Sequence, residues 1–147
     1  MKNTLILFLA IGSFISSCGN GEPETDTYFY VKNSSTHNVK LSVFDAIYHS
    51  IGGFKDSTYV IPINSEISYF YYMKGSNGNY TEPFGVSADS AYITFDDSLR
   101  IVYRKNDSLQ RNLLHIDSYI EFKRNNEWFE YKYSITEADY HNAVLIK

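Results

Sequence analysis

Apolar and polar residues alternate over most of the chain that follows residue 27. An aromatic run at 28–32 and the sequence Val-Lys-Leu-Ser-Val at 39–43 flank a polar gap rich in Asn and Ser. A period of two on both sides of a turn-rich gap predicts a β-hairpin. We expect Val39, Leu41 and Val43 to face the core, because alternate residues of a strand share one face.

Similar runs recur towards the C-terminus. They cover residues 59–63 and 66–72 around Asn64-Ser65, residues 91–95 and 99–103 around Asp96-Asp97-Ser98, and residues 128–135. Pro62 cannot donate a hydrogen bond to a neighbouring strand, so the strand beside it should lie at a sheet edge. About seven strands at a spacing of roughly 8–12 residues predict an all-β fold, an antiparallel β-sandwich that is loosely immunoglobulin-like.

Two segments depart from this pattern and predict short helices. Ser118 and Glu121 have the spacing of a capping box, which predicts a helix near 119–124. Thr136 is a good N-cap, and the acidic residues that follow it suit the first turn of a second, C-terminal helix. That helix would place Tyr140, Ala143 and Val144 on one face, closing an end of the sandwich.

Composition supports the β assignment. The 147 residues include 14 Tyr, 10 Phe and 1 Trp, or 17% aromatic residues, and these types favour pleated, half-buried surfaces. The chain carries 13 Lys and Arg against 17 Asp and Glu. An acidic balance argues against nucleic acid as a partner, because the phosphate backbone requires clustered cations.

The first eighteen residues have the order of an export signal. Lys2 precedes an apolar run at 5–11, and two small residues at 16–17 precede Cys18, the only cysteine. The apolar part covers roughly 11 residues, against about 20 for a membrane-spanning helix. Ile15-Ser16-Ser17-Cys18 resembles a bacterial lipobox, which implies cleavage before Cys18, lipidation of its sulfur (with palmitate among the acyl groups) and membrane attachment. The alternative is an ordinary secretory peptide that leaves Cys18 as a lone thiol.

The chain therefore divides into a lipoprotein signal peptide at 1–17, an acylated cysteine with a flexible tether at 18–26, and a β-sandwich domain at 27–147. The tether contains Glu22, Glu24 and Asp26 but no large apolar residue, which is typical of a solvated segment. Gly19 rather than Asp follows the cysteine, and in Gram-negative sorting this favours the outer membrane. Either face of that membrane is open.

The C-terminal segment also carries a resemblance. Tyr131-x-Tyr133-x-Ile135-Thr136-Glu137-x-Asp139-Tyr140-x-x-Ala143, together with the lipobox, resembles the pattern of small lipoproteins of the Bacteroidota type. The resemblance implies membership of an envelope lipoprotein group and brings no activity with it. Physically, the motif is a strand, a helix cap and a helix.

Catalytic and metal-binding signatures are missing from the sequence. No G-x-S-x-G or H-E-x-x-H occurs, and the four histidines are scattered through expected loops and helix ends. A Ser-His-Asp triad stays open, because triads are recognised by geometry. Asp96 and Asp97 form an oxygen-rich cluster without the ligand spacing of a calcium loop, so we expect them to build a turn. We expect no enzyme activity, no cofactor and no metal.

Aromatic residues offer a binding hypothesis. Tyr and Trp on a rigid β-surface can stack on sugar rings while their polar atoms form hydrogen bonds. The candidates for such a glycan-binding surface are Tyr69, Tyr71, Tyr72, Tyr80 and Trp128. The structural alternative is that these side chains cover or fill the sandwich.

A repeated triplet offers a modification hypothesis. Asp, then Ser or Thr, then a methyl-bearing residue occurs four times, each time with Ser, where chance placement predicts roughly half an occurrence. The triplet resembles the O-glycosylation acceptor of exported Bacteroidota-type proteins, with Ser57, Ser90, Ser98 and Ser108 as candidate acceptors. Ser57 and Ser108, in expected loops, suit it best, although Asp-Ser pairs also favour turns.

The sequence thus predicts an envelope lipoprotein held by acyl chains on Cys18, acting as a non-enzymatic accessory or interaction module with a protein or glycan partner. A glycan-binding surface lipoprotein is the alternative function.

Overall fold

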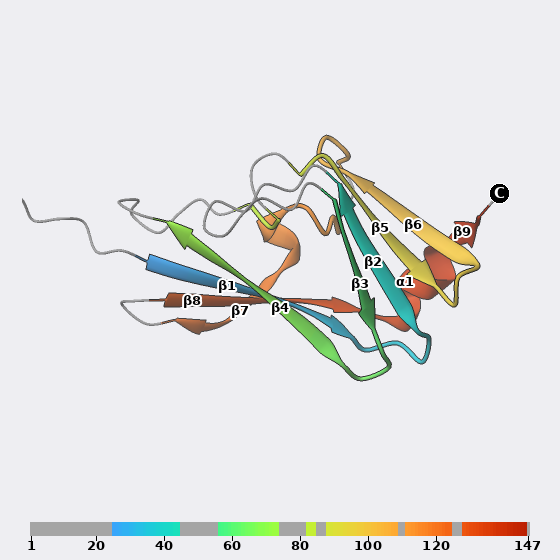
Figure 1. The fold of residues 1–147 in the computed structure, drawn as a ribbon, viewed down its shortest axis with the longest axis horizontal. Coiled ribbons are helices and arrows are strands. Elements are labelled where there is room, and N and C mark those ends of the chain that lie inside the picture. Colours follow the sequence, from blue (N-terminus) through green and yellow to red (C-terminus); the bar gives the residue numbers. More distant parts are fainter. Residues whose placement is uncertain are drawn as a thin grey trace, which may run out of the picture.

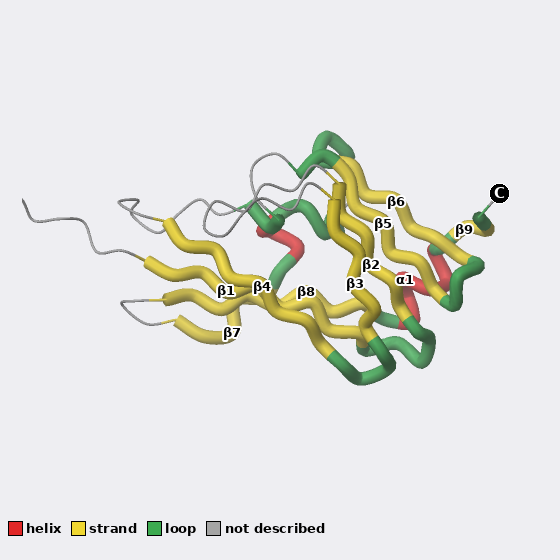
Figure 2. Tube along the Cα trace, in the orientation of Figure 1, coloured by secondary structure: helices red, strands yellow, loops and turns green. Residues whose placement is uncertain are grey.

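The protein is a β-sandwich of two sheets, as expected from the alternation. The computed structural model describes residues 25–44, 56–73, 82–84, 88–108, 111–124 and 128–146. The first sheet has the strand order β4 (Glu66–Met73), β1 (Thr25–Asn33), β8 (Trp128–Ile135) and β7 (Ile120–Arg124). The second has the order β3 (Asp56–Ile61), β2 (Val39–Phe44), β5 (Ser90–Phe95), β6 (Leu99–Arg104) and β9 (Val144–Leu145). Figures 1 and 2 show both sheets.

One pairing departs from the antiparallel expectation. β1 and β8 run parallel in the middle of the first sheet, with Phe29 opposite Tyr131, whereas every other pairing between the described strands is antiparallel. The two strands are about a hundred residues apart in sequence, so no hairpin dictates their relative direction. β1 also begins at Thr25, inside the segment assigned to the tether.

The core lies between the sheets. Val39, Leu41 and Val43 are fully or almost fully buried, which confirms their predicted orientation. Leu113 and Leu114 are buried as well, and the segment that carries them lies between the two sheets, just before the 3-10 helix η1 (Ile116–Ser118) (Figure 1). Alternating apolar side chains from both sheets therefore meet in a single core.

The helix predicted near 119–124 is wrong. Residues 120–124 form β7, which pairs with β8. Ser118, the supposed N-cap, instead accepts a hydrogen bond from the Asn112 backbone N–H at 2.8 Å, so its hydroxyl is used by the preceding loop. A capping-box spacing is a local signal, and here strand pairing overrides it.

The C-terminal helix is confirmed as α1 (Glu137–Asn142). The Asp139 carboxylate accepts hydrogen bonds from the Thr136 backbone N–H (2.7 Å) and hydroxyl (3.0 Å), which fixes the start of the helix. Tyr140 and Ala143 pack against the core, as expected. Val144 does not: it belongs to β9 and is 67% exposed.

The strands converge on one end of the sandwich, which we call the turn pole. It consists of the β1–β2 turn, the β3–β4 turn, the β5–β6 turn and α1, on the right-hand side of Figure 1. Hydrogen bonds join them: Asn33 N–H to Ser65 O (2.9 Å), Ser34 N–H to Ile135 O (2.8 Å) and Asp96 N–H to Asn38 O (3.0 Å). The nine residues of β1 span about 30 Å, at roughly 3.3 Å per residue, from the turn pole to the other end.

Candidate functional site

Five residues in register form a band across the outer face of the second sheet, close to the turn pole. Lys40 is opposite Val60 and Thr94, Thr94 is opposite Arg100, and Arg100 is opposite Val144. Residues directly opposite one another in antiparallel strands point to the same face. We call this set the turn-pole row; it contains Val60, Lys40, Thr94, Arg100 and Val144.

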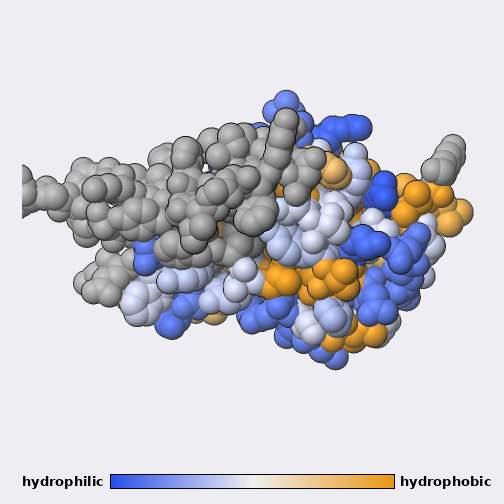
Figure 3. All heavy atoms as spheres, viewed as in Figure 1, coloured by the Kyte–Doolittle hydropathy of each residue, from blue (hydrophilic) through white to orange (hydrophobic). Residues whose placement is uncertain are grey.

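The row is apolar at its ends and polar at its centre. Val60 and Val144 are 65% and 67% exposed, and apolar atoms gather around β9 in Figure 3. Thr94 is only 5% exposed, because long side chains lie on both sides of it. Four strand-to-strand steps of about 4.8 Å separate the ends, so the row is roughly 19 Å long.

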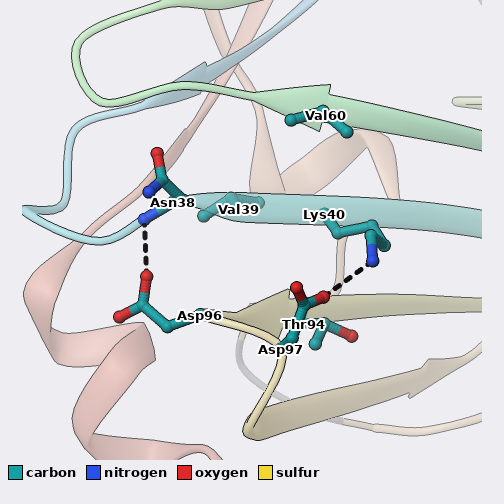
Figure 4. Close-up of a pocket in the computed structure, with 7 residues that line it drawn as sticks. All are labelled: Asn38, Val39, Lys40, Val60, Thr94, Asp96 and Asp97. Carbon is teal, nitrogen blue, oxygen red and sulfur yellow. Dashed lines mark hydrogen bonds and ion pairs between the residues drawn. The ribbon is translucent and has the colours of Figure 1, made fainter.

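A pocket opens beside the row. Its volume is about 280 Å³, and its lining residues come from the β1–β2 turn, β2, β3, β5 and the β5–β6 turn (Figure 4): Asn38, Val39, Lys40, Val60, Thr94, Asp96 and Asp97. Val60 supplies apolar surface, whereas the side chain of Val39 faces the core, and the other residues supply hydrogen-bonding groups. The pocket therefore extends the polar centre of the row towards the turn pole.

The β5–β6 turn holds its two aspartates in an uncommon backbone conformation. Asp96 and Asp97 have φ angles of 46° and 55°, and Ser98 N–H donates to Phe95 O at 3.0 Å. Positive φ at both central residues is what a type I′ turn requires, and Asp tolerates this region better than most residues. The expectation that these residues build a turn is confirmed.

Each of these carboxylates has a partner in β2 or the turn before it. Asp96 accepts from Asn38 N–H at 3.0 Å and lies 2.6 Å from His37 Nδ1. The hydrogen bond from His37 is the main reason that the pKa of Asp96 lies below its usual value. Asp97 Oδ1 is 2.7 Å from Lys40 Nζ. The two aspartates thus fix the β5–β6 turn against β2.

His37 connects this turn to α1. Its ring stacks on Tyr140, with centroids 3.6 Å apart and an interplanar angle of 9°, and its Nε2 lies 3.7 Å from Glu137 Oε2. Glu137 also accepts a hydrogen bond from the Thr36 backbone N–H, which is the largest cause of its lowered pKa. Three separate segments therefore meet at one imidazole.

Arg100 is held in place by a hydroxyl group and an aromatic ring. Its Nε donates to Thr94 Oγ1 at 3.3 Å, and its guanidinium carbon lies 4.9 Å from the centroid of the Tyr92 ring. No carboxylate among the described residues forms an ion pair with it, whereas Lys40 is paired with Asp97. The row therefore presents one oriented cation whose charge is not balanced by a described neighbour.

The predicted glycan-binding residues are only partly described. Trp128, in β8, is half-buried, and Lys123 Nζ lies 5.3 Å from its ring centroid. The backbones of Tyr69, Tyr71 and Tyr72 belong to β4, opposite Phe29, Thr27 and Asp26, but their side chains are outside the described part of the structure. Tyr80 and Cys18 lie outside the described residues altogether.

A different pair of aromatic residues meets on the outer face of the first sheet. The Tyr30 and Phe122 rings are in edge contact at 5.4 Å, and Lys132 Nζ lies 4.7 Å from the Phe122 centroid. Phe122 is 47% exposed and nearby Ile120 is 71% exposed. A helix near 119–124, as expected from the sequence, would not have brought this pair together; the alternation Ile-Glu-Phe-Lys was the available signal.

The candidate glycosylation serines occupy different environments. Ser98 and Ser108 are exposed, in a turn and a loop. Ser57, expected in a loop, is instead half-buried in β3 opposite Val43. Ser90 is the half-buried first residue of β5, and its hydroxyl donates to Asp89. Strand pairing thus removes Ser57 from the loop environment that favoured it.

The described histidines form no catalytic pair with serine. Ring nitrogens of His115 and His141 lie 2.6 Å from the backbone oxygens of Lys105 and Glu137, and His37 faces carboxylates. His49 is outside the described residues. Within the ranges that the structure covers, no group of three His, Cys, Asp or Glu side chains is arranged to hold a metal ion. Neither described helix has the length and apolar character needed to cross a membrane.

The sequence matches no known protein family and no curated protein.

Proposed function

We propose that this protein is a lipid-anchored, non-enzymatic interaction module of the outer envelope that offers its turn pole to a partner. The proposal starts from the lipobox, in which Cys18 would carry the acyl chains. Thr25, where β1 begins, follows Cys18 by seven residues, which span at most about 25 Å. The start of β1 would then stay near the lipid surface.

The turn pole is at the opposite end of β1. The length of that strand, about 30 Å, would carry the turn pole away from the membrane. The turn-pole row and its pocket are close to this end; in the row, exposed valines flank an arginine that has no acidic partner among the described residues. The observation that supports the proposal is that the row and its pocket lie near the end of β1 opposite Thr25.

Anchoring is tested by Cys18→Ser in the native host. The variant should leave the envelope fraction and migrate as the unprocessed chain, because neither acylation nor cleavage before residue 18 could occur. A variant that stays in the pelleted envelope with unchanged migration would refute the anchor.

Partner binding is tested by photo-crosslinking in intact envelopes. A photoreactive residue replaces Val60 in the row, Phe122 on the first sheet, or Asp117, an exposed position on neither surface. We expect one adduct of defined mass from position 60 and none above background from position 117. Equal labelling at positions 60 and 117, or no labelling at position 60, would contradict the use of the turn pole.

A glycan-binding function is the second candidate. The exposed Phe122 ring, its contact with Tyr30 and the nearby Lys132 ammonium combine an apolar surface with hydrogen-bond donors, which suits the two chemical faces of a sugar. A panel of envelope oligosaccharides, titrated against the wild-type chain and Phe122→Ala, tests it. Binding that depends on Phe122, with no crosslink from position 60, would favour this function over the first.

A further inference from the structure

We infer that the turn-pole row is a docking surface for an extended segment of a partner protein, with an apolar side chain at each end and a carboxylate over Arg100. The inference rests on the proposed function and specifies the chemistry of the partner. Its three parts are the charge of Arg100, the exposed valines and the length of the row.

The charge argument begins with the cations. Lys40 Nζ is 2.7 Å from Asp97 Oδ1, so its charge is balanced within the protein. Arg100 has no acidic partner among the described residues, although Thr94 and the Tyr92 ring hold its guanidinium in place. An arginine fork that is already oriented loses little entropy when it binds, and its planar geometry matches a carboxylate. The complementary group is therefore an acidic side chain.

The ends of the row require apolar groups. Val60 and Val144 are about two-thirds exposed, and Leu145, beside Val144 in β9, is 74% exposed. Covering each of them removes apolar area from water, which favours binding at roughly 25 cal/mol per Å². A free anion would satisfy Arg100 and leave both valines exposed.

The length of the row favours a polypeptide as the ligand. An extended chain advances about 3.3 Å per residue, so seven residues cover the roughly 19 Å between the ends of the row. Alternate side chains would face the sheet. An apolar first residue would contact Val144, an acidic third residue would reach Arg100, a polar fifth residue would meet the Lys40–Asp97 ion pair, and an apolar seventh residue would contact Val60.

The test uses the acylated mature chain in detergent micelles and a fluorescein-labelled peptide, Leu-Ser-Glu-Ser-Thr-Ser-Leu. A second peptide has glutamine in place of glutamate. We expect the wild-type protein to bind the glutamate peptide about tenfold more tightly by fluorescence anisotropy, the factor that corresponds to roughly 1.4 kcal/mol. Arg100→Gln should abolish this preference, and Arg100→Lys should keep part of it because the charge remains.

Two controls separate docking from folding. Arg104→Gln removes an exposed arginine from the same strand, outside the row, and should leave the preference unchanged. Val60→Ser should weaken both peptides by the same factor and preserve their ratio, since it removes apolar contact alone. Thermal melting curves of all variants establish that the sandwich is folded.

Equal affinity for the two peptides, or no binding of either, would overturn the inference. An Arg100-dependent interaction with a glucuronate oligosaccharide, without peptide binding, would assign the row to an anionic glycan and would also overturn it. The proposed function and this inference can fail independently. A crosslink from position 60 with no peptide binding would support the interaction module but refute the proposed peptide chemistry.

Discussion

Asn33 is the polar side chain on which the turn pole most depends. It is fully buried at the end of β1, and its Nδ2 donates to His37 O (2.8 Å) and Ile61 O (2.9 Å). Its Oδ1 accepts from the Ser35 backbone N–H (3.1 Å) and hydroxyl (2.7 Å). One amide therefore ties the β1–β2 turn to the end of β3, next to Val60.

Asn33→Ala should lower the free energy of unfolding substantially. The substitution removes four hydrogen bonds, each of net value about 0.5–1.5 kcal/mol. In the variant, the His37 carbonyl can still accept a hydrogen bond from the Ser35 hydroxyl at 3.3 Å. The Ile61 carbonyl and the Ser35 N–H lose their hydrogen bonds to Asn33, and these two losses account for most of the cost. The expected cost is about 3 kcal/mol, which corresponds to a fall in Tm of roughly 12 °C for a domain of this size.

Urea denaturation of the full chain, followed by far-UV circular dichroism, measures this loss. Ser35→Ala is the matched variant: it removes the hydroxyl bond to Asn33 Oδ1 and two longer contacts with the His37 backbone, both at 3.3 Å, but keeps both donations from Asn33. It should cost about 1 kcal/mol. Asn142→Ala, exposed at the end of α1, should stay within about 0.5 kcal/mol of wild type. If Asn33→Ala cost no more than Ser35→Ala, the assigned role of Asn33 would be wrong.

Three further predictions concern acid stability, the helix cap and modification. The pKa values of Asp96 and Glu137 are lowered in the folded state, so these carboxylates stabilise the fold above their unfolded pKa values, and this stabilisation is lost as pH falls below about 4.5. The midpoint of urea unfolding should therefore fall between pH 6 and pH 3, and less steeply for His37→Ala. Asp139→Asn replaces the charged acceptor of two hydrogen bonds from Thr136 with a neutral amide and should cost about 2 kcal/mol, measured by urea denaturation; a loss below about 0.5 kcal/mol would contradict the cap. Intact-mass spectra of the protein from its native host should show hexose-containing additions that are lost in Ser108→Ala; spectra with lipid alone would refute O-glycosylation.

Local patterns predicted the elements whose cause is local. Alternation placed Val39, Leu41 and Val43 in the core, and the Asp96-Asp97-Ser98 sequence gave the turn between two strands, because both follow from residues within a few positions. The same holds for the start of α1 at Thr136 and the acidic residues in its first turn.

Competing partners explain the errors. Ser118 was a plausible N-cap until the fold supplied the Asn112 backbone N–H as its partner. Ser57 follows an aspartate, as a turn residue often does, but pairing with Val43 draws it into β3. The parallel pairing of β1 with β8 depends on contacts about a hundred residues apart, which no local signal encodes.

The turn-pole row could not be found in the sequence, because five strands contribute one residue each. Alternation shows that Lys40 and Arg100 lie on outer faces, but it leaves the register between strands open. A register shift of one residue would turn the outward-facing residues of a strand towards the core. A shift of two residues would leave them on the outer face but move the members of the row out of alignment. The turn contacts decide between these registers, since Asp96 bonds both the carbonyl and the N–H of Asn38 and thereby aligns β5 with β2. The alignment of the row thus depends on hydrogen bonds made by turn residues that belong to no part of the row.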